Sequence, residues 1–135
     1  MSYFLFLDDI RIPSDVTWCD WRKNKLQIIT TRTVDDFKKV ITERGIPEHL
    51  TFDYDLFNWD GTGLDCAKFF AEFVETNDIH LPDNFYYYVH SLNEQGAYKI
   101  RDYMTSFLEK RKEEGKFNGI TRPSRVTNFD GMVMF

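Results

Sequence analysis

A chain of 135 residues can bury a sizeable core without help from a metal ion or a disulfide. Its formal net charge of −5 argues against a broad surface for DNA or for an anionic membrane. Two cysteines outside any CxxC pair argue against a structural zinc site and a disulfide framework. No apolar run approaches the roughly 18 residues of a membrane span, and the first run is broken too early for a signal peptide. We therefore expect a soluble, cytoplasmic protein.

The N-terminal part of the chain alternates short apolar runs with polar segments. Residues 3–7 form an apolar run that stops at Asp8 and Asp9, which is typical of a strand buried on both faces. An irregular insertion that contains tryptophans follows at about residues 11–25. Residues 27–31 are rich in β-branched side chains and predict a second strand.

The middle of the chain repeats a pattern of helix and strand. Thr33 is a good N-cap for a helix whose apolar spacing continues until Gly45. Residues 50–53 predict a third strand, which again ends in acid. Residues 64–74 carry the apolar stripe of a second helix.

A strand, a long helix and a tail complete the chain. Residues 85–89 predict a fourth strand, and an apolar stripe over residues 97–108 predicts a third helix. The tail, from about residue 117 to 135, is less regular. Within it, Ile120 or Val126 could lie in a fifth strand.

The alternation of strands and helices predicts a mainly parallel sheet that is covered by helices on both faces. We expect a flavodoxin-like α/β domain, a three-layer α/β/α sandwich with strand order 2-1-3-4-5, that spans residues 1–135 as a single unit. In such sheets the ligand crevice lies beyond the carboxyl ends of the strands, where the strand order reverses. Polar residues that follow three of the predicted strands should meet there.

Acidic residues follow two of those strands. Gathered at one edge they would repel one another, and a divalent cation such as Mg²⁺ (or Mn²⁺), which prefers carboxylate oxygens, would relieve the repulsion. Any one of these aspartates alone more simply caps a turn after a strand. As a set they predict a metal site, and the candidate ligands are Asp8, Asp9, Asp53 and Asp55.

Other polar side chains near the same edge suit a phosphate group. Ser91 could donate a hydrogen bond to a phosphate oxygen, while His90 could act as a general acid or base, or be satisfied by backbone at a strand end. Asn93 could contact the ligand or cap the next helix. Arg11 and Arg32 could bind phosphate through two N–H groups each, or be ordinary surface charges.

The arrangement resembles the response-regulator receiver domain. Asp8 and Asp9 after the first strand, together with Asp53 after the third, match the acids of that domain, and Ser91 matches its hydroxyl residue. The resemblance implies that the acids bind Mg²⁺ and that Asp53 accepts a phosphoryl group. The chain departs from the receiver pattern because no Lys-Pro follows a clear fifth strand, and an Arg-Pro pair at Arg122 is the nearest substitute.

Five short motifs in order are closely similar to one receiver-like family, the cyclic-phosphate processing receiver domain. The similarity covers about residues 3–108, and the motifs are LFLDDIRIP, TTRT, FDYDL, TGLD and VHSLN. It implies a reaction on cyclic phosphates, for example at RNA 2′,3′-cyclic ends, more firmly than it implies one substrate.

We therefore predict metal-dependent phosphoryl-group chemistry, with Asp53 and His90 as the catalytic residues. The reaction would hydrolyse or open a cyclic phosphate on a nucleotide or RNA end, so the partner is a small phosphorylated ligand, a cyclic nucleotide or an RNA terminus. Two alternatives stay open: a phospho-accepting signalling module that uses Asp53, and a nucleotide-binding protein without chemistry. The sequence indicates no oligomeric state.

Overall fold

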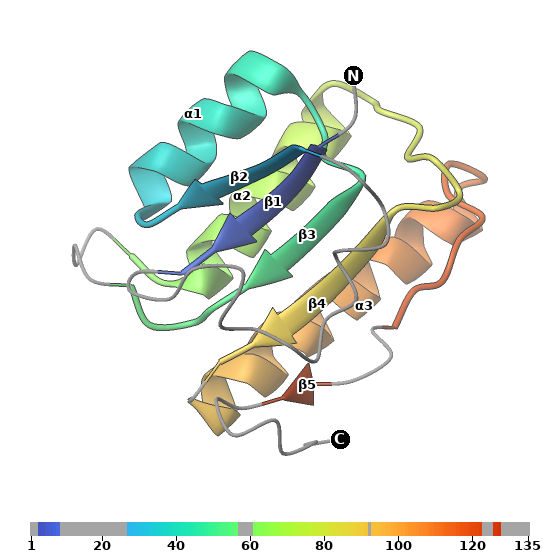
Figure 1. The fold of residues 1–135 in the computed structure, drawn as a ribbon. Helices are drawn as coiled ribbons and strands as arrows, with labels where there is room; N and C mark the ends of the chain where they lie inside the picture. Colours follow the sequence, from blue (N-terminus) through green and yellow to red (C-terminus); the bar gives the residue numbers. More distant parts are fainter. Residues whose placement is uncertain (1–2, 9–26, 57–60, 92, 123–125, 128–135) are drawn as a thin grey trace.

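The structure, a computed structural model, describes residues 3–8, 27–56, 61–91, 93–122 and 126–127. Strands and helices alternate along this part of the chain (Figure 1). In chain order the elements are β1 (Tyr3–Leu7), β2 (Gln27–Thr31), α1 (Val34–Arg44), β3 (His49–Phe52), α2 (Gly63–Thr76), β4 (Tyr86–His90), α3 (Glu94–Glu113) and β5 (Val126–Thr127).

The strands form one sheet in the order β2-β1-β3-β4-β5, and every neighbouring pair is parallel. The predicted α/β class, the parallel sheet and the strand order are therefore confirmed, while the described helices cover one face of the sheet rather than both. From β2 at one edge, the chain adds β3, β4 and β5 in the same direction across the sheet. Right-handed crossovers then place α1, α2 and α3 on the same face, and Figure 1 shows all three on one side of the sheet.

This helix-covered face holds the main hydrophobic core. Side chains alternate between the two faces of a strand, so Leu5 and Leu7 of β1 point the same way as Phe52 of β3 and Val89 of β4. They pack against buried helix residues such as Phe70. The intervening residues of the same strands point to the second face. The predicted insertion at about residues 11–25 lies outside the described residues.

Side-chain caps mark the first turns of α1 and α2. Thr33 caps α1 by accepting a hydrogen bond from the backbone N–H of Asp36 at 3.1 Å, as expected. Thr62 and Asp65 form a capping box at the start of α2, in which each side chain accepts from the other's backbone. None of the described helices combines the length and the apolar character of a transmembrane span.

The bounds of β3 and β4 differ from the prediction by one residue, whereas those of β1 and β2 match it. His90 is the last residue of β4 rather than the residue after it, because His90 pairs with Thr127 of β5 and this pairing extends the ladder. Of the two candidates for the fifth strand, Val126 lies in it. Ile120 does not, and its side chain is 61% exposed.

Candidate metal and phosphate site

Three polar side chains form one row, called here the buried row, at the carboxyl ends of adjacent strands: Asp8, Asp53 and His90. Phe6 pairs with Thr51 across β1 and β3, so Asp8 lies opposite Asp53 two residues further on. The backbone N–H of Asp53 donates to the carbonyl of Leu7 at 3.0 Å, which holds the two strand ends together. Asp8 is fully buried, and Asp53 is only 5% exposed. The fold thus brings together acids that are far apart in the sequence.

His90 completes this row from β4, on the second face of the sheet. Its Nε2 lies 3.1 Å from Oδ2 of Asp8, and its Nδ1 lies 2.6 Å from the hydroxyl of Thr51. The ring stacks on Phe6, with centroids 4.7 Å apart and planes 10° from parallel. Asp8, Thr51 and His90 are all fully buried. These contacts of the imidazole are made with side chains, and the catalytic assignment of His90 stays a prediction.

Asp53 and Ser91 meet at the backbone of Tyr54. The Tyr54 N–H donates to Oδ1 of Asp53 at 2.8 Å and points to the hydroxyl oxygen of Ser91 at 3.4 Å. The N–H of Asn93 also donates to that oxygen, at 3.1 Å. Because a serine hydroxyl that accepts in this way keeps its own proton, Ser91 can still donate to a nearby phosphate oxygen.

Asn93 is the N-cap of α3, which was one of its two predicted roles. Its Oδ1 accepts from the N–H of Gly96 at 2.9 Å, and its Nδ2 donates to Oδ2 of Asp55 at 3.4 Å. Asp55 is exposed and lies with Asn93 at the start of α3, outside the buried row. The metal role of Asp55 and the ligand role of Asn93 stay predictions.

Arg32 is the one predicted phosphate-binding arginine among the described residues. Its Nη1 donates to the backbone carbonyl of Asp8 at 3.1 Å, so the guanidinium lies beside the buried row. Arg11 and Asp9 lie outside the described residues. Within the described part of the chain, no group of three or more His, Cys, Asp or Glu side chains could hold a metal ion.

The donors that are present fit a hard divalent cation. Asp8 and Asp53 supply carboxylate oxygens, the ligands that Mg²⁺ prefers, from adjacent strand ends. Two buried carboxylates at neighbouring positions repel each other, and a cation would offset that repulsion. The chemistry of the donor set therefore suits the ion that the sequence predicts.

Two glycines allow the loop after Asp53 to approach the helices closely. A Cβ atom on Gly63 would lie 1.8 Å from the carbonyl oxygen of Asp53, and one on Gly96 would lie 2.3 Å from the ring of Tyr54. The N–H of Gly63 also donates to the carbonyl of Tyr54 at 2.7 Å. Sequence reasoning missed both glycines, although a glycine in the first turn of a helix is a detectable signal.

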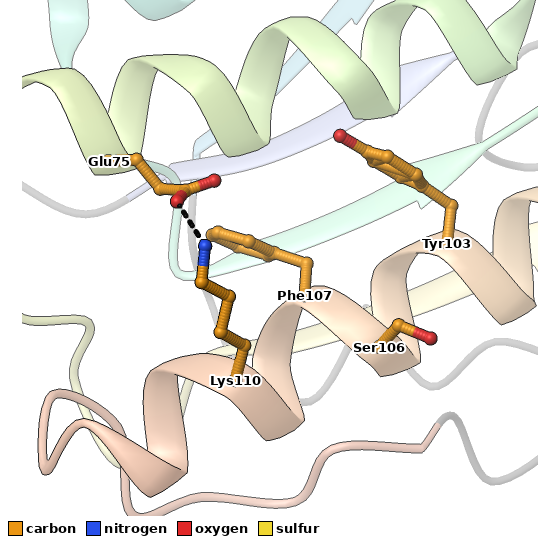
Figure 2. Close-up of a pocket in the computed structure, with 5 residues that line it drawn as sticks. All are labelled: Glu75, Tyr103, Ser106, Phe107 and Lys110. Atoms are coloured by element: carbon orange, nitrogen blue, oxygen red, sulfur yellow. Dashed lines mark hydrogen bonds and ion pairs between the residues drawn. The ribbon is translucent and has the colours of Figure 1, made fainter.

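A shallow pocket of about 210 Å³ lies elsewhere, between α2 and α3 (Figure 2). Its edge carries an ion pair in which Lys110 Nζ and a Glu75 carboxylate oxygen are 3.0 Å apart. The hydrogen bond and charge of Glu75 raise the pKa of Lys110. None of the predicted site residues lines this pocket, whose walls are Glu75, Tyr103, Ser106, Phe107 and Lys110.

A parallel sheet of this order, with buried acids at the carboxyl ends of β1 and β3, defines the class of receiver-like α/β domains. Within this class, the chain belongs to the cyclic-phosphate processing receiver domain family, whose model matches residues 3–106. The resemblance seen in the five motifs is thereby confirmed.

One solved structure similar to the chain is the signal receiver domain of a protein named as a Luxo repressor, from Vibrio parahaemolyticus. The two share 20% sequence identity and superpose with a TM-score of 0.45. The match covers 67% of this chain and 61% of that chain. No curated protein matches the chain.

Proposed function

We propose that the chain carries out metal-dependent phosphoryl-group chemistry, in which a cyclic phosphate on a nucleotide or RNA end is hydrolysed or opened. The observation that carries the proposal is the buried row in which Asp8 and Asp53 lie at adjacent strand ends and His90 binds Asp8. Membership of the cyclic-phosphate processing receiver domain family supports the class of substrate.

The cation, Mg²⁺ or Mn²⁺, would be held by Asp8 and Asp53, with Asp9 and Asp55 as further candidate ligands. The chemistry that such an ion supplies is polarisation of the phosphodiester. Carboxylates that are buried before substrate arrives need little reorganisation, which favours binding of a cation in a fixed position.

The chain's own residues would handle the phosphate and the protons. In hydrolysis, a water oxygen bonds to phosphorus, one ring P–O bond breaks, and the freed sugar oxygen takes a proton. Asp53 would accept the proton of the water, or attack phosphorus itself to form an acyl phosphate that water then cleaves. Ser91 would donate to a phosphate oxygen, and Arg32 and Arg11 would offset its charge.

The sequence predicts that His90 is catalytic, which would make it the donor of the proton that the leaving oxygen takes. Its Nε2 faces Oδ2 of Asp8, so direct donation to a substrate requires that hydrogen bond to open first. This geometry supports an influence of His90 on the reaction through Asp8, and the leaving oxygen then takes its proton from solvent.

A panel of cyclic nucleotides and RNA oligonucleotides with 2′,3′-cyclic ends, incubated with Mg²⁺ or Mn²⁺, tests the proposal. We expect the full chain to release linear monophosphates, and EDTA to stop this release. Asp8→Asn and Asp53→Asn should each lower the rate at least about 100-fold, the size of effect seen when one charge-stabilising group is removed from an active site.

Asp102→Asn is the matched control, because it makes the same chemical change on a side chain of α3 that is 75% exposed. It should leave the rate unchanged. Equal rates for the wild type, Asp8→Asn and Asp53→Asn would remove the buried row from the mechanism and contradict the proposal.

A second candidate function is a phospho-accepting receiver module. The observation that favours it is the contact of Asp53 and Ser91 with one backbone N–H, that of Tyr54, which couples a phosphoacceptor to a hydroxyl. Acetyl phosphate and intact-mass measurement distinguish the two functions. A stable adduct that Asp53→Asn removes, without turnover of any cyclic phosphate, would favour signalling. Recovery of bound, unmodified nucleotide after denaturation would instead indicate binding without chemistry.

A further inference from the structure

The hydroxyl of Thr51, the ring of His90 and the carboxylate of Asp8 form a continuous hydrogen-bonded chain across three strands of the sheet. Thr51 lies on β3, His90 on β4 and Asp8 just beyond β1, so each contact joins a different pair of strands. We infer that Thr51 and His90 are positioning residues that fix the orientation of the Asp8 carboxylate in the proposed metal site. This inference rests on the proposed function for its purpose, but its geometry can be tested separately.

The register of the sheet explains why these residues meet. Thr51 pairs with Phe6 on one side and with Tyr88 on the other, so its side chain points to the second face, as do Phe6, Asp8 and His90. The imidazole lies flat on the ring of Phe6. Stacking fixes the plane of the imidazole, and the two hydrogen bonds then fix its rotation within that plane.

The donors in the chain follow from elementary chemistry. An ionised carboxylate only accepts hydrogen bonds, so Nε2 of His90 must carry the proton that faces Oδ2 of Asp8. Thr51 meets the other ring nitrogen at 2.6 Å and stops the ring from flipping away from Asp8. A histidine that is held in this way can hold a metal-binding carboxylate in turn, and loss of such a supporting contact typically weakens metal binding about 10- to 100-fold.

Thr51→Val is the most direct variant, because valine has nearly the same shape as threonine and lacks the hydroxyl. Thr51→Ser is its matched control, since serine keeps the hydroxyl and loses only a methyl group. The first measurement is the ¹H–¹⁵N spectrum of the histidine side chains in protein without added metal, where the sheltered Nε2–H of His90 should give a resolved signal. We expect Thr51→Ser to keep this signal, and Thr51→Val to broaden or shift it.

The second measurement is Mg²⁺ affinity, taken from the rise in unfolding temperature as MgCl₂ is added. We expect Thr51→Val to weaken the apparent affinity at least about 10-fold and Thr51→Ser to keep it near that of the wild type. If Thr51→Val does not fold, the wild-type spectrum still tests the positioning role. The spectrum must show the proton on Nε2 of His90, and the signal of that proton must shift in Asp8→Asn.

The results separate this inference from the proposed function. Thr51→Val could change both the spectrum and the Mg²⁺ affinity while the wild type turns over no cyclic phosphate. That result would contradict the proposed reaction and support the positioning role. A wild-type proton on Nδ1 alone, or a Thr51→Val protein with unchanged spectrum and affinity, would overturn the positioning role even if the wild type is active.

Discussion

Gly63 lies where the first turn of α2 touches the backbone of Asp53. Replacing glycine by alanine within a helix normally raises the stability of the protein by about 1 kcal/mol. At this position the sign should reverse, because the added Cβ would lie 1.8 Å from the carbonyl oxygen of Asp53 and the backbone would have to move. We expect Gly63→Ala to lower the free energy of unfolding by about 2 kcal/mol, as overpacking of a tight contact does.

Urea unfolding measures this change, and Ser106→Ala, at an exposed position of α3, is the control in which alanine should cost nothing. The same displacement should disturb Asp53, so activity in Gly63→Ala should fall even under conditions where the protein is folded. A Gly63→Ala protein as stable as the wild type would mean that the close approach of α2 to Asp53 is not required.

Some of these residues could be anticipated from the sequence and some could not. Asp8 and Asp53 could be, because a run of apolar residues that ends in acid marks the carboxyl end of a buried strand. The contact between Thr51 and His90 could not, because it depends on the register of β3 against β4, which the sequence of neither strand specifies. A threonine in an apolar strand is also expected simply from its β propensity.

At the scale of the element, the start of α3 combines a structural and a candidate functional role in Asn93. Its side chain caps the helix by accepting from the N–H of Gly96 and also reaches Asp55. Asn93→Ala should lower the free energy of unfolding by about 1 kcal/mol, whereas Asn93→Ser, which keeps a capping oxygen, should lose only a small part of that. Urea unfolding followed by helical circular dichroism gives both values.

Activity in the same two variants separates the roles. If Asn93 only caps α3, Asn93→Ser should keep the wild-type rate on whichever cyclic phosphate proves to be a substrate. A large loss of rate in the stable Asn93→Ser protein would instead show a ligand contact by the Asn93 side chain. Asn93→Ser as unstable as Asn93→Ala would contradict the capping role.

Helices were easier to place than strand ends for a physical reason. Thr33 and Asn93 carry side-chain oxygens that satisfy the free N–H groups of a first turn, so each cap is visible within a few residues of sequence. A strand ends where its neighbour stops pairing, and that depends on another part of the chain. The extension of β4 to His90 by pairing with β5 is such a case.

At the scale of the whole molecule, the order of strands followed from rules that do not depend on individual side chains. Alternating strands and helices, together with right-handed crossovers, leave few ways to arrange one sheet, and the predicted order was the correct one. The face of the sheet that carries the buried row was harder to predict from the sequence. Asp8, Asp53 and His90 share the second face only because the registers of β1, β3 and β4 agree in phase.

Tyr3 connects the first strand to the end of α1 and should make the stability of the fold sensitive to alkaline pH. Its hydroxyl donates to the carbonyl of Gly45 at 2.5 Å, and burial raises the pKa of Tyr3 from 10.0 to about 12. A pKa that is higher in the folded state means that the neutral form stabilises the fold. This stabilisation is complete below the unfolded pKa and is lost as the pH rises from about 10 to about 12.

We expect this loss to be about 2–3 kcal/mol, which corresponds to a pKa shift of about two units at about 1.4 kcal/mol per unit, because the side chain of Tyr3 is buried. Tyr3→Phe should be about 1 kcal/mol less stable than the wild type at neutral pH, where it lacks the hydrogen bond, and should lose less stability across the alkaline range. Burial also raises the pKa of Tyr87, so part of the alkaline loss should persist in Tyr3→Phe. Urea unfolding at a series of pH values tests this, and curves for the two proteins that fall in parallel from neutral to alkaline pH would show that Tyr3 does not contribute.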